Sequence, residues 1–134
     1  MVSLFVIALL LVPLLPGSRT KNSDYYLRLQ SRWEMSFIAE ALKQFEIKNG
    51  KFPAGNNVSI IQNSGGTNSD EVVFLNLLAA TNSAGEMLDS WKVPFKIEVL
   101  AQTNFTIRSA GKDKIFGDAD DVIFNSVSND FVKP

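Results

Sequence analysis

Four aspartates are gathered in the segment 113–121 near the C-terminal end of the chain. They are Asp113, Asp118, Asp120 and Asp121, with Gly117 among them and Lys112 and Lys114 beside them. Carboxylate oxygens are hard ligands, and Ca²⁺ takes six to eight oxygens from side chains and backbone carbonyls. The segment is either a calcium-binding loop or a solvated turn, because Asp and Gly also form turns. Its spacing is not that of an EF-hand.

Catalysis is not expected from the remaining residue types. The chain has no Cys and no His, so thiol nucleophiles, imidazole bases and zinc sites of the usual kinds are absent. A glycosidase would need two carboxylates across a cleft, and no pattern indicates a substrate groove. Asp89 near Trp91 is compatible with a site where the Trp ring stacks on a sugar, or with a Trp that packs in the hydrophobic core. We favour the core position. The formal charge of -1 provides no basic field, so nucleic acid is not an expected partner.

The N-terminal residues 2–15 are apolar and uncharged, and Pro16 follows them. A bilayer-spanning helix needs about 20 residues, so the run is a cleaved signal peptide, a buried helix or a membrane anchor whose first residues precede this sequence. We expect the anchor, over 1–18, with a globular domain over 19–134. Four basic residues follow the run, Arg19, Lys21, Arg28 and Arg32, and they would place that domain in the cytoplasm. A basic leader upstream of Met1 would reverse this, and we expect one.

A long helix is expected from about Asp24 to Asn49. Its predicted core face consists of Trp33, Phe37, Ile38, Ala41, Leu42 and Phe45, and the predicted solvent face of Glu34, Glu40, Lys43 and Lys48. Gly50 should end the helix in a left-handed conformation, and Pro53 should prevent its resumption.

Alternating apolar residues predict strands at 95–99, 105–108 and 122–126. A capping pattern at Asn68 and Glu71 predicts a short second helix that fades by Thr81. The expected fold class is α+β, with one long N-terminal helix packed on a small antiparallel sheet and a C-terminal acidic loop.

Four short stretches between the long helix and the C-terminus carry further patterns. Residues 41–53 read ALKQFEIKNGKFP, 89–95 DSWKVPF, 105–111 FTIRSAG and 113–122 DKIFGDADDV. In this order they resemble A-L-x-x-Y-x-x-x-N-G-x-Y-P, D-P-W-G-x-P-Y, F-x-I-x-S-x-G and D-x-x-x-G-x-x-D-D-I of the type II secretion major pseudopilin, the G-type subunit of the pilin-like superfamily. Phe45, Phe52, Ser90 and Lys92 depart from these patterns, and the Gly-Phe-Thr-Leu-Ile-Glu processing motif is missing.

The resemblance implies a pilin-like fold and a structural role in a pseudopilus that drives protein secretion across the outer membrane. It implies a single-pass inner-membrane protein with its C-terminal domain in the periplasm, and other pseudopilin subunits and secretion-system assembly proteins as partners. In the implied calcium loop, side-chain oxygens come from Asp113, Asp120 and Asp121 and a backbone carbonyl from Ser109, while Asp118 occupies a variable position. The alternative is a signal-anchored or secreted calcium-binding module that does not polymerise.

Overall fold

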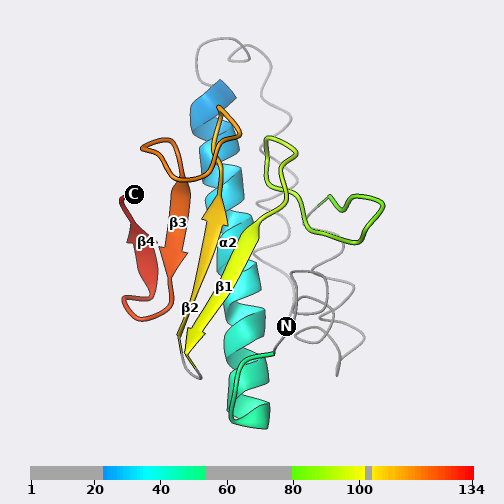
Figure 1. Ribbon diagram of the computed structural model, residues 1–134, viewed down its shortest axis with the longest axis vertical. Helices are drawn as coiled ribbons and strands as arrows, with labels where there is room; N and C mark the ends of the chain where they lie inside the picture. Colours follow the sequence, from blue (N-terminus) through cyan, green and yellow to red (C-terminus); the bar gives the residue numbers. More distant parts are fainter. Residues whose placement is uncertain (1–22, 54–79, 102–103) are drawn as a thin grey trace, which may run out of the picture.

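The computed structural model describes residues 23–53, 80–101 and 104–134, and it confirms the α+β class (Figure 1). Helix α2, Ser23–Asn49, packs on one antiparallel sheet with the strand order β1-β2-β3-β4. The strands are β1 Lys96–Ala101, β2 Asn104–Ser109, β3 Val122–Asn125 and β4 Asp130–Val132. The anchor expected over 1–18 and the second helix predicted from Asn68 lie outside the described residues.

Helix α2 ends where the sequence predicts. Gly50 adopts a left-handed φ of 73°, and its amide donates to the carbonyl oxygen of Glu46 at 2.7 Å. Such a residue satisfies one of the carbonyls that a helix end leaves open, and glycine adopts the conformation without a steric penalty. Within the described part of the chain, no helix is both apolar enough and long enough to cross a bilayer.

The core face of α2 matches the predicted one in part, because Ile38 and Leu42 are buried as expected and Phe37 and Ala41 are partly buried against the hydrophobic cluster. The buried side chains of the helix are Ser31, Glu34, Met35, Ile38, Ala39 and Leu42. Trp33, expected in the core, is 44% exposed, whereas Glu34, expected in solvent, is 6% exposed. Apolar residues occur on both sides of this helix. The periodicity alone therefore predicted a buried face that is rotated around the helix axis by about one residue, roughly 100°, from the observed one.

The sheet covers that stripe through its two central strands. Phe105 and Ile107 are buried in β2, and Val122 and Phe124 are buried in β3. In each strand the two residues are two positions apart, so their side chains lie on the same face of the sheet. These side chains join Met35, Ile38 and Leu42 in one hydrophobic cluster. Fully burying a side chain of this size stabilises a fold by roughly 1.5–3 kcal/mol.

The two edge strands depart from the sequence expectation. Val99 is one of the alternating apolar residues of the predicted strand at 95–99, yet it is 38% exposed, and β1 is an edge strand. Strand β4 was not predicted at all. It pairs antiparallel with β3, and the Phe131 ring contacts that of Phe124 edge to face at 5.5 Å.

Candidate functional site

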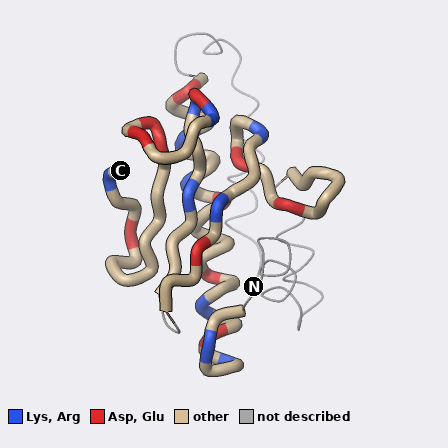
Figure 2. Tube along the Cα trace, in the orientation of Figure 1, with Lys and Arg blue, Asp and Glu red and all other residues tan. Residues whose placement is uncertain are grey.

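The acidic loop, residues 110–121, connects β2 to β3. Its two ends are held together, because Ser109 and Val122 are paired in the sheet. The loop lies beside the first turns of α2, and Figure 2 shows acidic and basic positions together at this end of the molecule. Segments far apart in the sequence therefore meet around the four aspartates.

Asp120 links the loop to α2. Its Oδ1 accepts a hydrogen bond from Arg28 Nη2 at 2.7 Å, and its backbone carbonyl accepts one from Arg28 Nη1 at 3.2 Å. Its other oxygen, Oδ2, accepts from the Asp113 amide at 3.0 Å. Partial burial opposes ionisation, but the amides of Asp113 and Lys112 and the Arg28 guanidinium outweigh it, so the pKa of Asp120 is lowered. Asp120 is thus an ionised carboxylate held by a cation.

Asp121 is the buried member of the group, with only 3% of its surface exposed. Its Oδ2 accepts from Arg108 Nη1 at 2.9 Å and from the Gly117 amide at 2.8 Å. Its Oδ1 is buried and has no hydrogen-bond partner. A buried carboxylate oxygen without a hydrogen-bond partner costs free energy, and Nε of Arg108, the residue that bonds Asp121 Oδ2, is likewise buried without a partner.

Asp113 and Asp118 lie on the open side of the loop, where their carboxyl groups contact each other. Asp113 Oδ1 accepts from the Ile115 amide, and Asp118 Oδ1 accepts from the Asp120 amide. The Ile115 amide lowers the pKa of Asp113, but contact with Asp118, desolvation and the charges of Asp118 and Asp120 together raise it. A raised pKa at an exposed carboxyl reports crowding of like charges, which a cation would relieve.

The root of the loop is fixed by a hydrogen-bond network centred on Asp89. Ser109 Oγ donates to Asp89 Oδ2 at 2.6 Å, and Asp89 Oδ1 accepts from the amides of Trp91 and Val93, each at 2.9 Å. Asp89 is 1% exposed and Trp91 is 7% exposed, so Trp91 is a core residue. The side chain of Ser109 is therefore engaged below the loop, and the predicted role of its carbonyl stays a prediction.

Gly111 occupies a position that only glycine fits. Its φ is +71°, and a Cβ built there would overlap both the carbonyl oxygen and the carboxylate of Asp120. This close approach holds the two arms of the loop against each other.

The donor chemistry of the loop suits a hard cation, because every candidate ligand is oxygen and one buried carboxylate oxygen is unpartnered. The arrangement divides the four acids into the open pair Asp113 and Asp118 and the arginine-paired Asp120 and Asp121. In the described ranges, no three Asp or Glu side chains converge closely enough to hold a metal ion. A bound cation would have to compete with Arg28 for Asp120 and with Arg108 for Asp121.

A second cluster joins α2 to the turn after Asp89. Ser31 Oγ donates to Ser90 Oγ at 2.9 Å and accepts from the Ser90 amide at 3.1 Å. One turn along the helix, Glu34 Oε1 accepts from Gln30, while Oε2 is buried without a partner. Desolvation raises the pKa of Glu34 to about 7, with a hydrogen bond from Gln30 and the charge of Lys92 opposing the shift and the charge of Asp89 adding to it.

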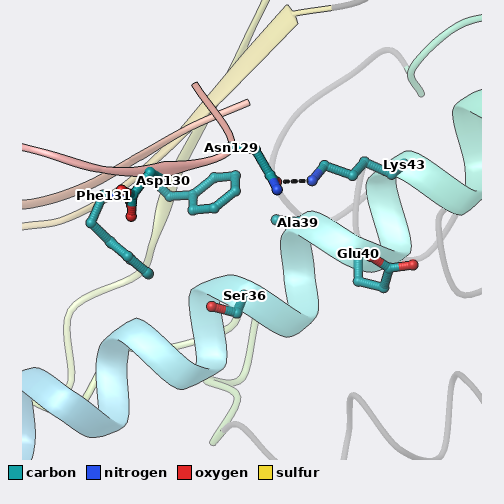
Figure 3. Close-up of a pocket in the computed structure, with 8 residues that line it drawn as sticks. Ser36, Ala39, Glu40, Lys43, Asn129, Asp130 and Phe131 are labelled. Carbon is teal, nitrogen blue, oxygen red and sulfur yellow. Dashed lines mark hydrogen bonds between the residues drawn. The ribbon is translucent and has the colours of Figure 1, made fainter. Parts of the chain in front are cut away.

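A pocket of about 280 Å³ lies between α2 and the β3–β4 hairpin (Figure 3). Lys43 donates a hydrogen bond to Asn129 across it, and its ammonium lies 5.6 Å from the Phe124 ring centroid. Arg32 stacks 4.3 Å over the ring of Phe131. These contacts tie the hairpin to the helix through cation–π attraction and hydrogen bonding.

The arginines and serines that position the loop are not predictable from local sequence patterns. Arg28 and Asp120 are separated by 92 residues in the chain, and Ser31 and Ser90 by 59. No local pattern signals such pairs, and Arg28 was interpreted only as a charge flanking the apolar run. Comparison of the chain with protein-family models, with curated proteins and with solved structures finds no match.

Proposed function

We propose that this protein is a membrane-anchored, pilin-like structural subunit of a type II secretion pseudopilus or a related filament, with a calcium-stabilised acidic loop. The observation that carries the proposal is the second apolar row of α2, on the side of the helix away from the sheet. Trp33 is 44% exposed and Ile47 is 72% exposed, and their spacing of fourteen residues places them on the same side of the helix. A helix that holds a sheet with one face and presents large apolar side chains with another suits a subunit that packs against further helices.

Three sequence features support the same proposal. The stretches 41–53, 89–95, 105–111 and 113–122 resemble the major pseudopilin in order, and residues 2–15 form an apolar run that suits an anchor. In this proposal the chain sits in the inner membrane with its C-terminal domain in the periplasm. Its partners are other subunits and secretion-system assembly proteins, and its role is mechanical, without catalysis.

Disulfide cross-linking tests the assembly role, since the chain has no native cysteine to interfere. The full chain carrying Trp33→Cys, reconstituted in lipid vesicles and treated with a mild oxidant, is expected to give a covalent dimer on a non-reducing gel. Val127→Cys, at an apolar position of the β3–β4 hairpin that is more exposed than Trp33 (71% against 44%), is the control and should stay monomeric. If both variants stay monomeric, the non-polymerising calcium-binding module becomes the better description.

Calcium is the ion that the loop would hold, with Asp113, Asp118, Asp120 and Asp121 as candidate side-chain ligands and Ser109 as a candidate backbone ligand. When bound, the cation would neutralise the carboxylates. Arg28 and Arg108 pair with Asp120 and Asp121, so the cation would have to displace these guanidinium groups or share the carboxylates with them. Magnesium is the poorer candidate, because it requires near-octahedral geometry and loses its waters reluctantly.

Thermal melting of the chain from Lys21 onward should therefore depend on calcium. At a concentration about 100-fold above the dissociation constant, calcium should add roughly 2.7 kcal/mol to the free energy of unfolding. For a domain of this size that raises the melting temperature by about 10 °C relative to chelator. Magnesium should give a much smaller shift.

The variants Asp113→Ala and Asp120→Ala should reduce the calcium-dependent shift, and Asp130→Ala, an exposed acid outside the loop, should retain it. The comparison is made within each variant, with and without calcium, so that any loss of intrinsic stability cancels. Equal melting temperatures in calcium and chelator for the unaltered chain would rule the calcium site out.

A further inference from the structure

Four large side chains are exposed at the end of the domain that carries the acidic loop. Ile115 is 63% and Phe116 38% exposed in the loop, while Tyr25 and Tyr26 are 59% and 45% exposed in the first turn of α2. The two pairs belong to one end of the molecule, because Arg28, one turn after the tyrosines, is bonded to Asp120 of the loop. We call these four residues the apical patch.

The sequence indicates what lies next to the apical patch. Helix α2 is described from Ser23, and the apolar run occupies residues 2–15. Only residues 16–22 separate the apolar run from the helix. An extended chain spans at most about 3.6 Å per residue, so the end of the run lies within roughly 25 Å of the start of α2. If the run is inserted in a bilayer, the apical end is held close to the bilayer surface.

We propose that the apical patch docks on the surface of the bilayer that holds the apolar run, a proposal that rests on the membrane anchoring proposed above. Tyrosine rings suit this position because they are apolar bodies with a polar tip, and they are enriched where membrane meets water. Ile115 and Phe116 are adjacent at the exposed part of the loop and enter the headgroup region together. Burying them there removes apolar surface from water.

The charges around the apical patch favour apolar insertion over attraction to anionic headgroups. Lys112 and Lys114 are exposed beside the patch, but so is Asp113, with Asp118 in contact with it. Arg28 is already paired with Asp120. Docking is therefore expected on zwitterionic and anionic lipids alike, with little dependence on salt.

Depth-dependent fluorescence quenching tests the docking. The full chain carrying Ile115→Cys is labelled with an environment-sensitive fluorophore and reconstituted in vesicles that contain lipids brominated near the headgroup. Val127→Cys is the matched control, because it is a similarly exposed aliphatic position in the hairpin at the other end of β3. We expect the emission at 115 to shift to the blue and to be quenched several-fold more than the emission at 127.

Three outcomes would overturn the docking. Equal quenching at the two positions, in a chain that sediments with the vesicles, leaves the anchor intact and refutes only the docking. A label at 115 that is shielded from aqueous iodide but untouched by brominated lipid means that protein, such as a second copy, covers the patch. A full chain that does not sediment with vesicles refutes the anchoring proposal and the docking with it.

Discussion

Replacing Asp89 by alanine is expected to lower the free energy of unfolding by about 4 kcal/mol, the largest effect of any single substitution considered. Asp89 is 1% exposed and accepts hydrogen bonds from Ser109 Oγ and from the amides of Trp91 and Val93. In the alanine variant the Ser109 hydroxyl and the two amides lose their acceptor. Each fully buried donor without an acceptor lowers the free energy of unfolding by roughly 1–3 kcal/mol. Because Ser109 ends β2 at the root of the acidic loop, the loop should also lose order.

Urea unfolding of the chain from Lys21 onward measures this effect. Asp89→Asn retains one acceptor oxygen for the two amides and should cost only about 1 kcal/mol, since the Ser109 hydroxyl can accept where it previously donated. Asp130→Ala removes an exposed carboxylate and should be nearly neutral. An Asp89→Ala variant within 0.5 kcal/mol of the unaltered chain would contradict the role given to this network.

The second large effect is expected from Glu34→Gln, and it should grow as the pH rises from about 4.5 to about 7. Burial raises the pKa of Glu34 from 4.5 to about 7, so the folded state binds this proton more tightly than the unfolded state does. The stability that the protonated group contributes is fully present below about pH 4.5 and is lost as the pH rises through about 7. At 1.36 kcal/mol per unit, the loss by pH 8 is roughly 3 kcal/mol.

Glutamine stays neutral and has the same size, so the variant should be about 3 kcal/mol more stable than the unaltered chain at pH 8. At pH 4.5 the two should agree within about 1 kcal/mol. The measurement is urea unfolding from pH 4.5 to 8, with Glu40→Gln as control, because Glu40 is exposed on the same helix. Other carboxyls contribute equally to all three chains, so a pH-independent difference between Glu34→Gln and the unaltered chain would show that Glu34 does not titrate as described.

The elements of this fold were predictable where their signals are local. Gly50 ends α2 because only a residue tolerant of a positive φ can close the last turn, and the chain provides one at the end of the apolar periodicity. The alternation in 105–108 predicted β2 and its buried face, because strand side chains alternate between the two faces of a sheet. The grouping of Asp113, Asp118, Asp120 and Asp121 was also visible, since all four lie in one loop.

The tertiary structure alone decided which face of α2 is buried and which partner each aspartate has. Trp33 and Glu34 exchange their expected environments because α2 has apolar residues on two sides, and only the sheet and the turn after Asp89 select between them. Arg28 and Arg108 pair with Asp120 and Asp121 because folding brings a helix, a strand and a loop to one end of the domain. Such contacts depend on where distant segments are placed in space. The sequence by itself therefore determined the local elements and the oxygen-rich chemistry of the loop, whereas packing determined the charge partners and burial on which that chemistry depends.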